Sequence, residues 1–275
     1  MTVRSFQLVA TDPLLRAQGV TLEYAGAHST VRATHDVSFD VYRGDRFVLL
    51  GPSGCGKSTL LKAVGGFIAP RAGSLFLNGL PITRPGPDRI VVFQEFDQLP
   101  PWKTVKRNVM FPLLAGGMGR REAEARALHW LAKVGLSGFV DAYPHTLSGG
   151  MKARVAIARA LAMQPDILLM DEPFAALDAL TRRQMQEELQ ALWEEIKFTM
   201  LFVTHSIEEA LVVGNRILLL SPHPGRVRAE LNCHQFGLHS AGSAEFQAAA
   251  ARIHGLLFDA PTPIVAAAPA QRVES

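Results

Sequence analysis

Five short apolar runs, each rich in branched side chains, recur along the chain. No polar residue interrupts them, so they predict strands that are buried on both faces, as in a parallel sheet covered by helices. The runs are FVLL (47–50), IVVF (90–93), ILLM (167–170), MLFV (200–203) and ILLL (217–220).

Other segments show a helical or an alternating period. The segments VTLEY (20–24) and VSFDVY (37–42) alternate, which predicts a half-exposed antiparallel sheet beside the parallel one. A helix is predicted over 178–197, between two of the buried strands. Its apolar stripe consists of Met185, Leu189, Leu192, Trp193 and Ile196.

The region from about 96 to 164 has a different character and is predicted to be a helical insertion. One helix is marked by Ala127, Trp130, Leu131 and Val134, and a second follows LSGG (147–150). After about 226 the periodicity fades except for a helix near 243–258, and the Ala/Pro-rich end predicts a frayed tail.

Composition narrows the class of protein. The chain has 275 residues, 48% of them hydrophobic and 19% charged, which excludes a disordered chain and allows one large or two small folding units. The net charge of +3 is only weak evidence for binding to nucleic acid or to an anionic membrane. Two cysteines favour a reducing cytosol, and without an apolar run of about 18 residues or a signal peptide any membrane role requires a partner.

The segment GPSGCGKST (51–59) carries the strongest chemical signal. It fits the phosphate-binding pattern G-x-x-x-x-G-K-[ST] and lies between a predicted strand and a predicted helix. Its glycines let successive N–H groups face one anion, Lys57 neutralises β and γ oxygens, and the Ser58 hydroxyl can ligate Mg²⁺. The predicted nucleotide-binding residues here are Gly51, Pro52, Ser53, Gly54, Cys55, Gly56, Lys57, Ser58 and Thr59, with Cys55 as a small packing residue.

Two carboxylates follow the run ILLM at the end of a predicted strand, where α/β sheets bind ligands. Asp171 is predicted to hold Mg²⁺, and Glu172 to accept a proton from an attacking water. These residues define a nucleoside triphosphatase that relies on ATP or GTP and Mg²⁺. A small kinase, a GTPase and a motor all remain open at this point.

The segment LSGGMKARVAIARAL (147–161) resembles the signature of ATP-binding-cassette (ABC) ATPases, and Ser148 lies 23 residues before Asp171, as in that family. Ser148 can cap a helix, and Gly149 and Gly150 leave its N–H groups bare for an anion. The resemblance implies a homodimer in which this segment of one subunit closes on the ATP held by the other.

Further positions match the ABC pattern. By this resemblance, Gln94 touches Mg²⁺ and the attacking water, His205 contacts the γ-phosphate, and Asp178 crosses the dimer interface. Asp178 is alternatively the cap of the helix over 178–197. Tyr24 aligns with the aromatic residue that stacks on adenine, although it could instead pack in its sheet, and His28 is an outside candidate.

The resemblance covers about 16–230 and implies an α/β, P-loop NTPase fold. A RecA-like parallel-sheet core (about 16–95 and 165–225) would carry the N-terminal antiparallel β-subdomain and the inserted helical subdomain (about 96–164). Residues 226–275 would form a C-terminal helix and disordered tail. One departure is Ala153, where a glutamine is common, and another is the stretch LPPWKTV (99–105).

The segments FQEFDQLPPWKTVKRNV and ILLLSPHPGRV resemble the ATPases of nitrate, taurine and alkanesulfonate importers. The resemblance implies an ATPase subunit at the cytoplasmic face of the inner (plasma) membrane, bound to permease subunits that work with a periplasmic or extracellular substrate-binding protein. An importer of another solute class is one alternative. A soluble cassette acting on nucleic acid or ribosomes and a P-loop kinase are the others, but the sequence shows no basic stripe and no tandem cassette.

Overall fold

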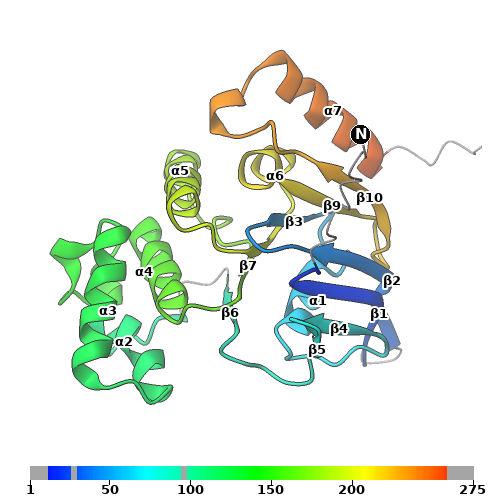
Figure 1. Cartoon of the computed structure of the whole chain (residues 1–275). Helices are drawn as coiled ribbons and strands as arrows, with labels where there is room; N and C mark the ends of the chain where they lie inside the picture. The colour runs from blue at the N-terminus through cyan, green and yellow to red at the C-terminus, as the bar shows by residue number, and fades with distance from the viewer. Residues whose placement is uncertain (1–11, 26–29, 94–97, 259–275) are drawn as a thin grey trace, which may run out of the picture.

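The computed structural model describes residues 12–25, 30–93 and 98–258. Two sheets and the helices around them make up this part of the chain (Figure 1). Gln94 and His28, two of the predicted site residues, lie outside the described residues.

The larger sheet has six strands in the order β10-β9-β3-β8-β7-β6, and only β10 runs antiparallel to its neighbour. Each of the five predicted buried runs forms one of its parallel strands, so this prediction is confirmed. The strands are β3 (Arg46–Leu50), β6 (Arg89–Val92), β7 (Ile167–Asp171), β8 (Met200–Thr204), β9 (Arg216–Leu220) and β10 (Val227–Asn232).

Both faces of the larger sheet are covered. Along β3, Phe47 and Leu49 pack into one hydrophobic core while Val48 and Leu50 pack into the other, and all four are fully buried. Helix α1 (Lys57–Val64) and the N-terminal sheet lie on the first face, and α5 and α6 lie on the second (Figure 1). This two-sided burial explains why the middle of such a strand is an uninterrupted apolar run.

The N-terminal sheet has four antiparallel strands in the order β2-β1-β4-β5. Along β2, Val37, Phe39 and Val41 are buried, whereas Ser38, between the first two, is exposed. This one-sided burial confirms the half-exposed antiparallel sheet expected from the alternating pattern. The strands are β1 (Leu15–Ala25), β2 (Thr30–Val41), β4 (Ala72–Leu77) and β5 (Leu80–Pro81).

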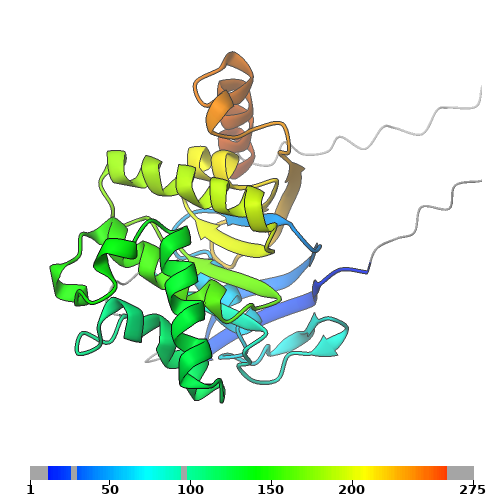
Figure 2. The ribbon, with the colours of Figure 1, turned by 60° about the vertical axis from the view of Figure 1, so that its left-hand side comes forward.

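Three helices connect β6 to β7 and pack against one another, as the helical insertion predicts (Figure 2). Leu131 is fully buried among them and Trp130 nearly so. Short 3-10 turns η2 (Ser137–Phe139) and η3 (Pro144–Thr146) lead into the last helix. The helices are α2 (Val105–Ala115), α3 (Arg120–Lys133) and α4 (Gly149–Ala162).

Helix α5 (Ala179–Ile196) joins β7 to β8, and α6 (Ile207–Val213) joins β8 to β9. The prediction of a helix over 178–197 is confirmed, since Met185, Leu189 and Leu192 of its stripe are buried. Burial decreases toward the end of the stripe, where Trp193 is half-buried and Ile196 is 37% exposed.

The chain beyond 226 contains more regular structure than the sequence predicts. The unexpected strand β10 adds to the edge of the larger sheet, followed by η4 (Leu238–Ser240) and the predicted helix, α7 (Ala244–Phe258). Arg228 of β10 donates to the carbonyl oxygens of Leu256 and Leu257 at the end of α7. Among the described residues, no helix is long and apolar enough to cross a membrane.

Candidate nucleotide-binding and catalytic site

The phosphate-binding loop connects the end of β3 to the start of α1. Gly54 (φ 78°) and Gly56 (φ 94°) adopt left-handed backbone conformations that favour glycine. Gly56 also lies against β2, because a Cβ atom there would approach the Ala33 carbonyl oxygen to 2.6 Å. The loop therefore curls tightly at the positive end of α1, as the sequence pattern predicts.

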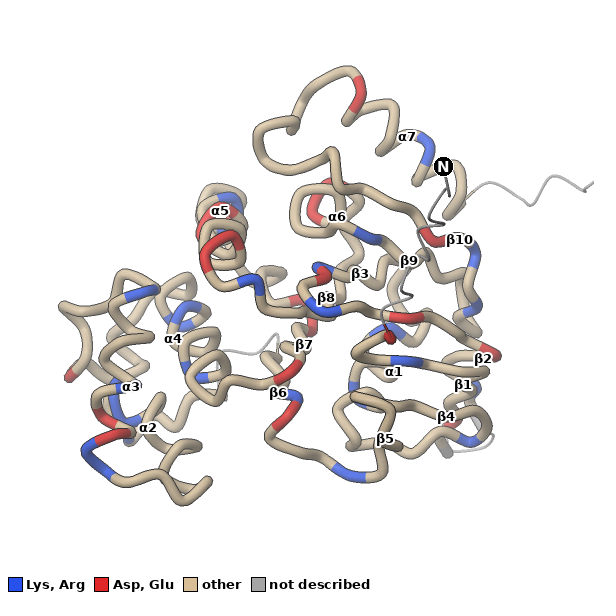
Figure 3. The backbone as a smooth tube through the Cα atoms, in the orientation of Figure 1, with Lys and Arg blue, Asp and Glu red and all other residues tan. Residues whose placement is uncertain are grey.

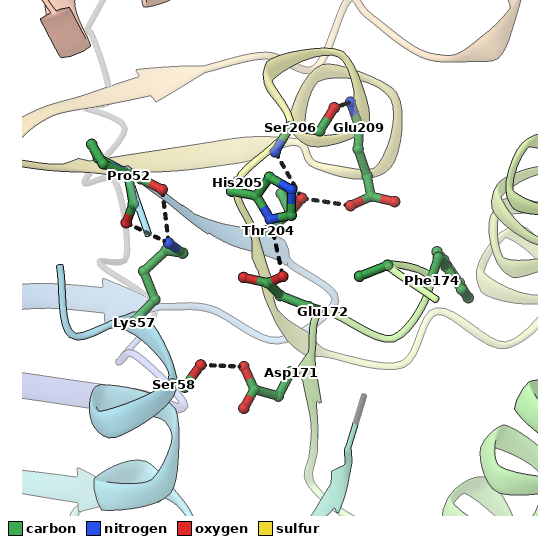
Figure 4. Close-up of polar contacts among 12 residues, drawn as sticks. Pro52, Lys57, Ser58, Asp171, Glu172, Phe174, Thr204, His205, Ser206 and Glu209 are labelled. Atoms are coloured by element: carbon green, nitrogen blue, oxygen red, sulfur yellow. Dashed lines mark hydrogen bonds and ion pairs between the residues drawn. The ribbon is translucent and has the colours of Figure 1, made fainter. Parts of the chain in front are cut away.

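Lys57 lies within this curl. Its side chain is buried, and its ammonium group donates to the carbonyl oxygens of Gly51 at 2.7 Å and Pro52 at 2.9 Å. Figure 4 shows these contacts at the edge of the site. A positive charge next to exposed loop N–H groups is an arrangement suited to a triphosphate.

Cys55, also in this loop, is fully buried. Burial raises the pKa of its thiol, although the nearby Lys57 opposes that effect. The protonated thiol is therefore favoured, as expected of a packing side chain and not of a nucleophile.

Ser58 of α1 and Asp171 at the end of β7 bring two oxygen donors together. The Ser58 hydroxyl donates to Asp171 Oδ1 at 2.7 Å (Figure 4). Burial raises the pKa of Asp171, and the hydrogen bond from Ser58 partly opposes this effect.

These two side chains fit Mg²⁺, which prefers hard oxygen ligands and takes few from the protein when phosphate and water supply the rest. Across the described ranges, no group of three His, Cys, Asp or Glu side chains could hold a metal ion by itself. A site completed by phosphate oxygens is therefore more suitable here than an all-protein metal site.

His205 contacts Glu172, the residue that follows Asp171. His205 Nδ1 lies 2.9 Å from Glu172 Oε2, although the two residues are 33 positions apart (Figure 4). Glu172 has a left-handed backbone conformation (φ 46°), which is uncommon for a residue with a side chain and turns the chain sharply at the end of β7. A carboxylate held beside an imidazole can accept a proton from a water molecule.

A buried network of hydrogen bonds, which the sequence did not predict, fixes Thr204, the residue before His205. Thr204 donates to Glu209 Oε2 at 2.5 Å, and Gln186 donates to Glu209 Oε1 at 3.0 Å. Glu209 and Gln186 are both buried, so their polar groups require these partners. The sequence gives one sign of this network, which is that Glu209 directly precedes the apolar stretch ALVV (210–213).

Ser148 and Asp178 each begin a helix. Ser148 Oγ accepts from Met151 N at 3.3 Å at the start of α4, and Asp178 Oδ1 accepts from Thr181 N at 3.0 Å at the start of α5. Both capping predictions are confirmed. Gly150 packs closely on this second helix, because a Cβ atom there would lie 2.9 Å from the Thr181 side chain.

Tyr24 and Ala153, two other positions singled out in the sequence, differ in their exposure to solvent. Tyr24 is 51% exposed at the end of β1, so part of its ring is accessible for stacking. Ala153 is buried in the core.

These features define a P-loop nucleoside triphosphatase. The glycine-rich loop and its buried lysine begin a helix, and two carboxylates lie at the end of β7 in the same sheet. Comparison with known proteins narrows the class. The family model described as ABC transporter matches residues 34–175.

Two relatives extend the match over most of the chain. The taurine import ATP-binding protein TauB of Rhizobium johnstonii is 51% identical over 220 residues, which are 80% of this chain and 84% of the relative. An uncharacterized ABC transporter ATP-binding protein of Methanocaldococcus jannaschii is 45% identical over 214 residues, which are 78% and 80% of the two chains.

Solved structures agree with this assignment. A dimeric ATP-binding cassette in a post-hydrolysis state, bound to ADP and Pi, has a TM-score of 0.68 and 33% identity, covering 80% of this chain and 98% of that one. The cbiO1 protein from Clostridium perfringens, part of an ABC transporter complex, has a TM-score of 0.72 and 27% identity, covering 82% and 90%. The chain belongs to the ABC transporter family of ATP-binding proteins, and it is an ATPase whose hydrolysis of ATP to ADP and phosphate is coupled to transport.

Proposed function

We propose that the chain is the ATP-hydrolysing subunit of an importer for a small anionic solute of the taurine, sulfonate or nitrate type. The observation that carries this proposal is the 51% identity to a taurine import ATP-binding protein over 80% of the chain. Identity at this level extends well beyond the phosphate-binding loop, which many unrelated nucleoside triphosphatases share.

The loop over residues 51–59 holds the triphosphate in this proposal. Its N–H groups and the start of α1 surround the β- and γ-phosphates, and Lys57 moves from the carbonyl oxygens of Gly51 and Pro52 onto phosphate oxygens. The exposed ring of Tyr24 stacks on adenine. Curled glycines and a buried lysine support these roles.

Hydrolysis takes place beside this loop. Ser58, Asp171 and Gln94 would hold Mg²⁺, which would neutralise charge that develops on the phosphate oxygens. Glu172 accepts the proton of the attacking water, and His205 contacts the γ-phosphate. The 2.9 Å contact between Glu172 and His205 supports a shared site for these two residues.

A second copy of the chain completes each nucleotide site. Ser148, Gly149 and Gly150 bind the γ-phosphate held by the partner copy, and Asp178 crosses the interface between the two copies. In one chain α4 and α1 are well separated (Figure 1), so the two helices cannot hold the same ATP. Ser148 is exposed, and the neighbouring Leu180 is 80% exposed, as an unoccupied contact surface requires.

The helical region, about 96–164, is the subdomain that docks a permease in this proposal, while the core spans about 16–95 and 165–225. Trp102 is 73% exposed and Phe111 is 49% exposed on this region, which gives a partner two aromatic anchors. Through the permease the chain lies at the cytoplasmic face of the inner membrane and works with an external substrate-binding protein. The tail beyond the helix α7 has no role in this proposal.

The role in transport is favoured over the alternative of a cassette that acts on nucleic acid. Lys and Arg are interspersed with Asp and Glu over the described chain (Figure 3). Tight binding to nucleic acid usually requires a clustered basic face.

The substitution Glu172→Gln tests the catalytic role. It keeps the size of the side chain but removes the base, so turnover should fall by at least about 10²-fold while ATP still binds. Size-exclusion chromatography with ATP and Mg²⁺ should then show a dimer. Glu187→Gln, at an exposed position of α5, is the matched control and should retain turnover. Undiminished turnover of the Glu172 variant would remove this residue as the base.

The solute class is tested with the complete importer in liposomes. The ATPase is assembled with its permease and binding protein, and ATP hydrolysis is measured with taurine, an alkanesulfonate, nitrate or an uncharged sugar. Stimulation by one of the three solutes with an anionic group supports the proposal. Stimulation by the uncharged sugar alone would contradict the solute class and leave the ATPase role intact.

A further inference from the structure

A short loop connects two residues to which different roles are assigned above. It runs from Glu172, at the end of β7, to Asp178, which caps α5. Within the loop the backbone makes two turns, since Ala175 N donates to the Glu172 carbonyl oxygen and Leu177 N donates to the Phe174 carbonyl oxygen, each at 3.1 Å. The relative positions of the base and the interface aspartate therefore depend on the conformation of a few residues.

Arg182, in the first turns of α5, holds this loop from within the same chain. Its Nε donates to the Phe174 carbonyl oxygen at 3.2 Å, and its Nη2 donates to the carbonyl oxygens of Leu177 at 2.9 Å and Ala175 at 3.4 Å. The planar guanidinium group holds its N–H donors in a fixed fork, whereas the compact ammonium group of lysine lacks this planar arrangement.

The charge of Arg182 is directed at the loop and not at an acidic side chain. Among the described residues, no Asp or Glu forms an ion pair with it. The adjacent Arg183 differs, since it is exposed and its Nε lies 3.4 Å from Glu187 Oε1 one turn along the helix. The two arginines therefore share a helix and a charge, but only one of them contacts the loop.

Apolar contacts fix the other side of the loop. Phe174 is fully buried, and the centroid of its ring lies 5.9 Å from the centroid of the Phe202 ring. Leu177 is also buried. Because these side chains anchor the loop to the core while Arg182 binds three of its carbonyl oxygens, the loop is constrained by both side-chain packing and charge-assisted hydrogen bonds.

We propose that Arg182 is a positioning residue for hydrolysis, which sets the loop so that Glu172 and Asp178 reach their working positions together when two copies of the chain close on ATP. The proposal rests on the roles given to those two residues above. Arg182 does not donate to the phosphate-binding loop, and its hydrogen bonds are to the 174–177 backbone. It should therefore influence turnover and closure much more than the binding of nucleotide to one copy.

The test compares Arg182→Ala, Arg182→Lys and Arg183→Ala in the full chain. For Arg182→Ala we expect turnover to fall by about 10- to 10²-fold, because displacing reacting groups by about 1 Å has effects of this size. ADP affinity should stay within about twofold, as the phosphate-binding loop keeps its contacts. Arg182→Lys should recover only part of the rate, and Arg183→Ala should match the unchanged chain.

Two further measurements separate positioning from a loss of stability. Millimolar guanidinium should restore part of the turnover of Arg182→Ala, since it can occupy the same carbonyl oxygens, and should not raise that of Arg183→Ala. In a Glu172→Gln background, adding Arg182→Ala should weaken the ATP-dependent dimer, and adding Arg183→Ala should not. Thermal unfolding identifies any variant that has lost its fold.

The outcomes distinguish this inference from the proposed function. If the unchanged chain neither hydrolyses ATP nor dimerises with it, the proposed function fails. If the unchanged chain does both, and a folded Arg182→Ala variant turns over and dimerises like Arg183→Ala, the inference about Arg182 is overturned. A parallel loss of ADP affinity in the Arg182 variant would also overturn it, because the residue would then act on nucleotide binding.

Discussion

Gly225 lies against the phosphate-binding loop, although it is distant in sequence, and its replacement by alanine should weaken nucleotide binding. The residue follows β9 and is fixed to β2, because Gly225 N donates to the Ala33 carbonyl oxygen and its own carbonyl accepts from His35 N, each at 2.9 Å. A Cβ atom at this position would lie only 2.1 Å from the carbonyl oxygen of Cys55.

The size of the effect follows from this distance. Carbon and carbonyl oxygen atoms approach to about 3.3 Å in close contacts, so the Gly225→Ala substitution requires a movement of about 1 Å. Forcing extra atoms into a packed site typically costs about 1–3 kcal/mol. Two hydrogen bonds hold the segment around Gly225, so we expect the Cys55 peptide to move, which would lower nucleotide affinity by about 5- to 150-fold.

The assay is calorimetric titration of the folded variant with ADP, which avoids hydrolysis during the measurement. Gly138→Ala is the matched control, because a Cβ atom at that position meets nothing within 4 Å. This control should bind ADP like the unchanged chain. If Gly225→Ala also binds ADP within about twofold of the unchanged chain, the phosphate-binding loop does not depend on this contact and the reasoning is refuted.

Two further predictions concern the stability of the fold. Phe202→Ala removes a fully buried ring from β8 and should lower the free energy of unfolding by about 3–5 kcal/mol in urea titrations, whereas Phe258→Ala, at a site 57% exposed, should cost less than about 1 kcal/mol. Burial raises the pKa of the Cys233 thiol to about 11, so the folded state holds this proton more tightly than the unfolded state. The free energy of unfolding should therefore fall as the pH rises from about 8.5 toward 11, and Cys233→Ala should reduce that slope; an equal slope in both proteins would contradict this account.

The parallel core could be predicted from the sequence because each central strand contains an apolar run that is buried on both faces and that no polar residue interrupts. The strand β10 could not, because its residues alternate between exposed and half-buried at the edge of the sheet. Its sequence, VRAELN, contains two charged residues and lacks the continuous apolar run that marks the central strands. Edge strands in general give a weaker signal, since only one side of them is paired.

In the candidate site, too, some parts could be predicted from the sequence and others could not. The phosphate-binding loop is a local motif, so its glycines and Lys57 could be read directly from the sequence. The supporting contacts are not local: Gln186 meets Glu209, and Gly225 meets the Cys55 carbonyl group, through the packing of distant segments. No spacing rule in a single sequence predicts such pairs, because they depend on how helices are placed against the sheet.

The order of the strands explains why the chemical groups gather at one edge of the sheet. Strand β8 lies between β3 and β7, and the register pairs Leu50 with Thr204 and Asp171 with Val203. The carboxyl ends of these three parallel strands are therefore level, so the phosphate-binding loop, the carboxylates and His205 emerge side by side. A histidine on the middle strand can contact groups on either neighbour, and in this structure it contacts Glu172. The same register would carry it toward a γ-phosphate held by the loop after β3, so a small movement of the imidazole can couple the proposed base to the bound nucleotide.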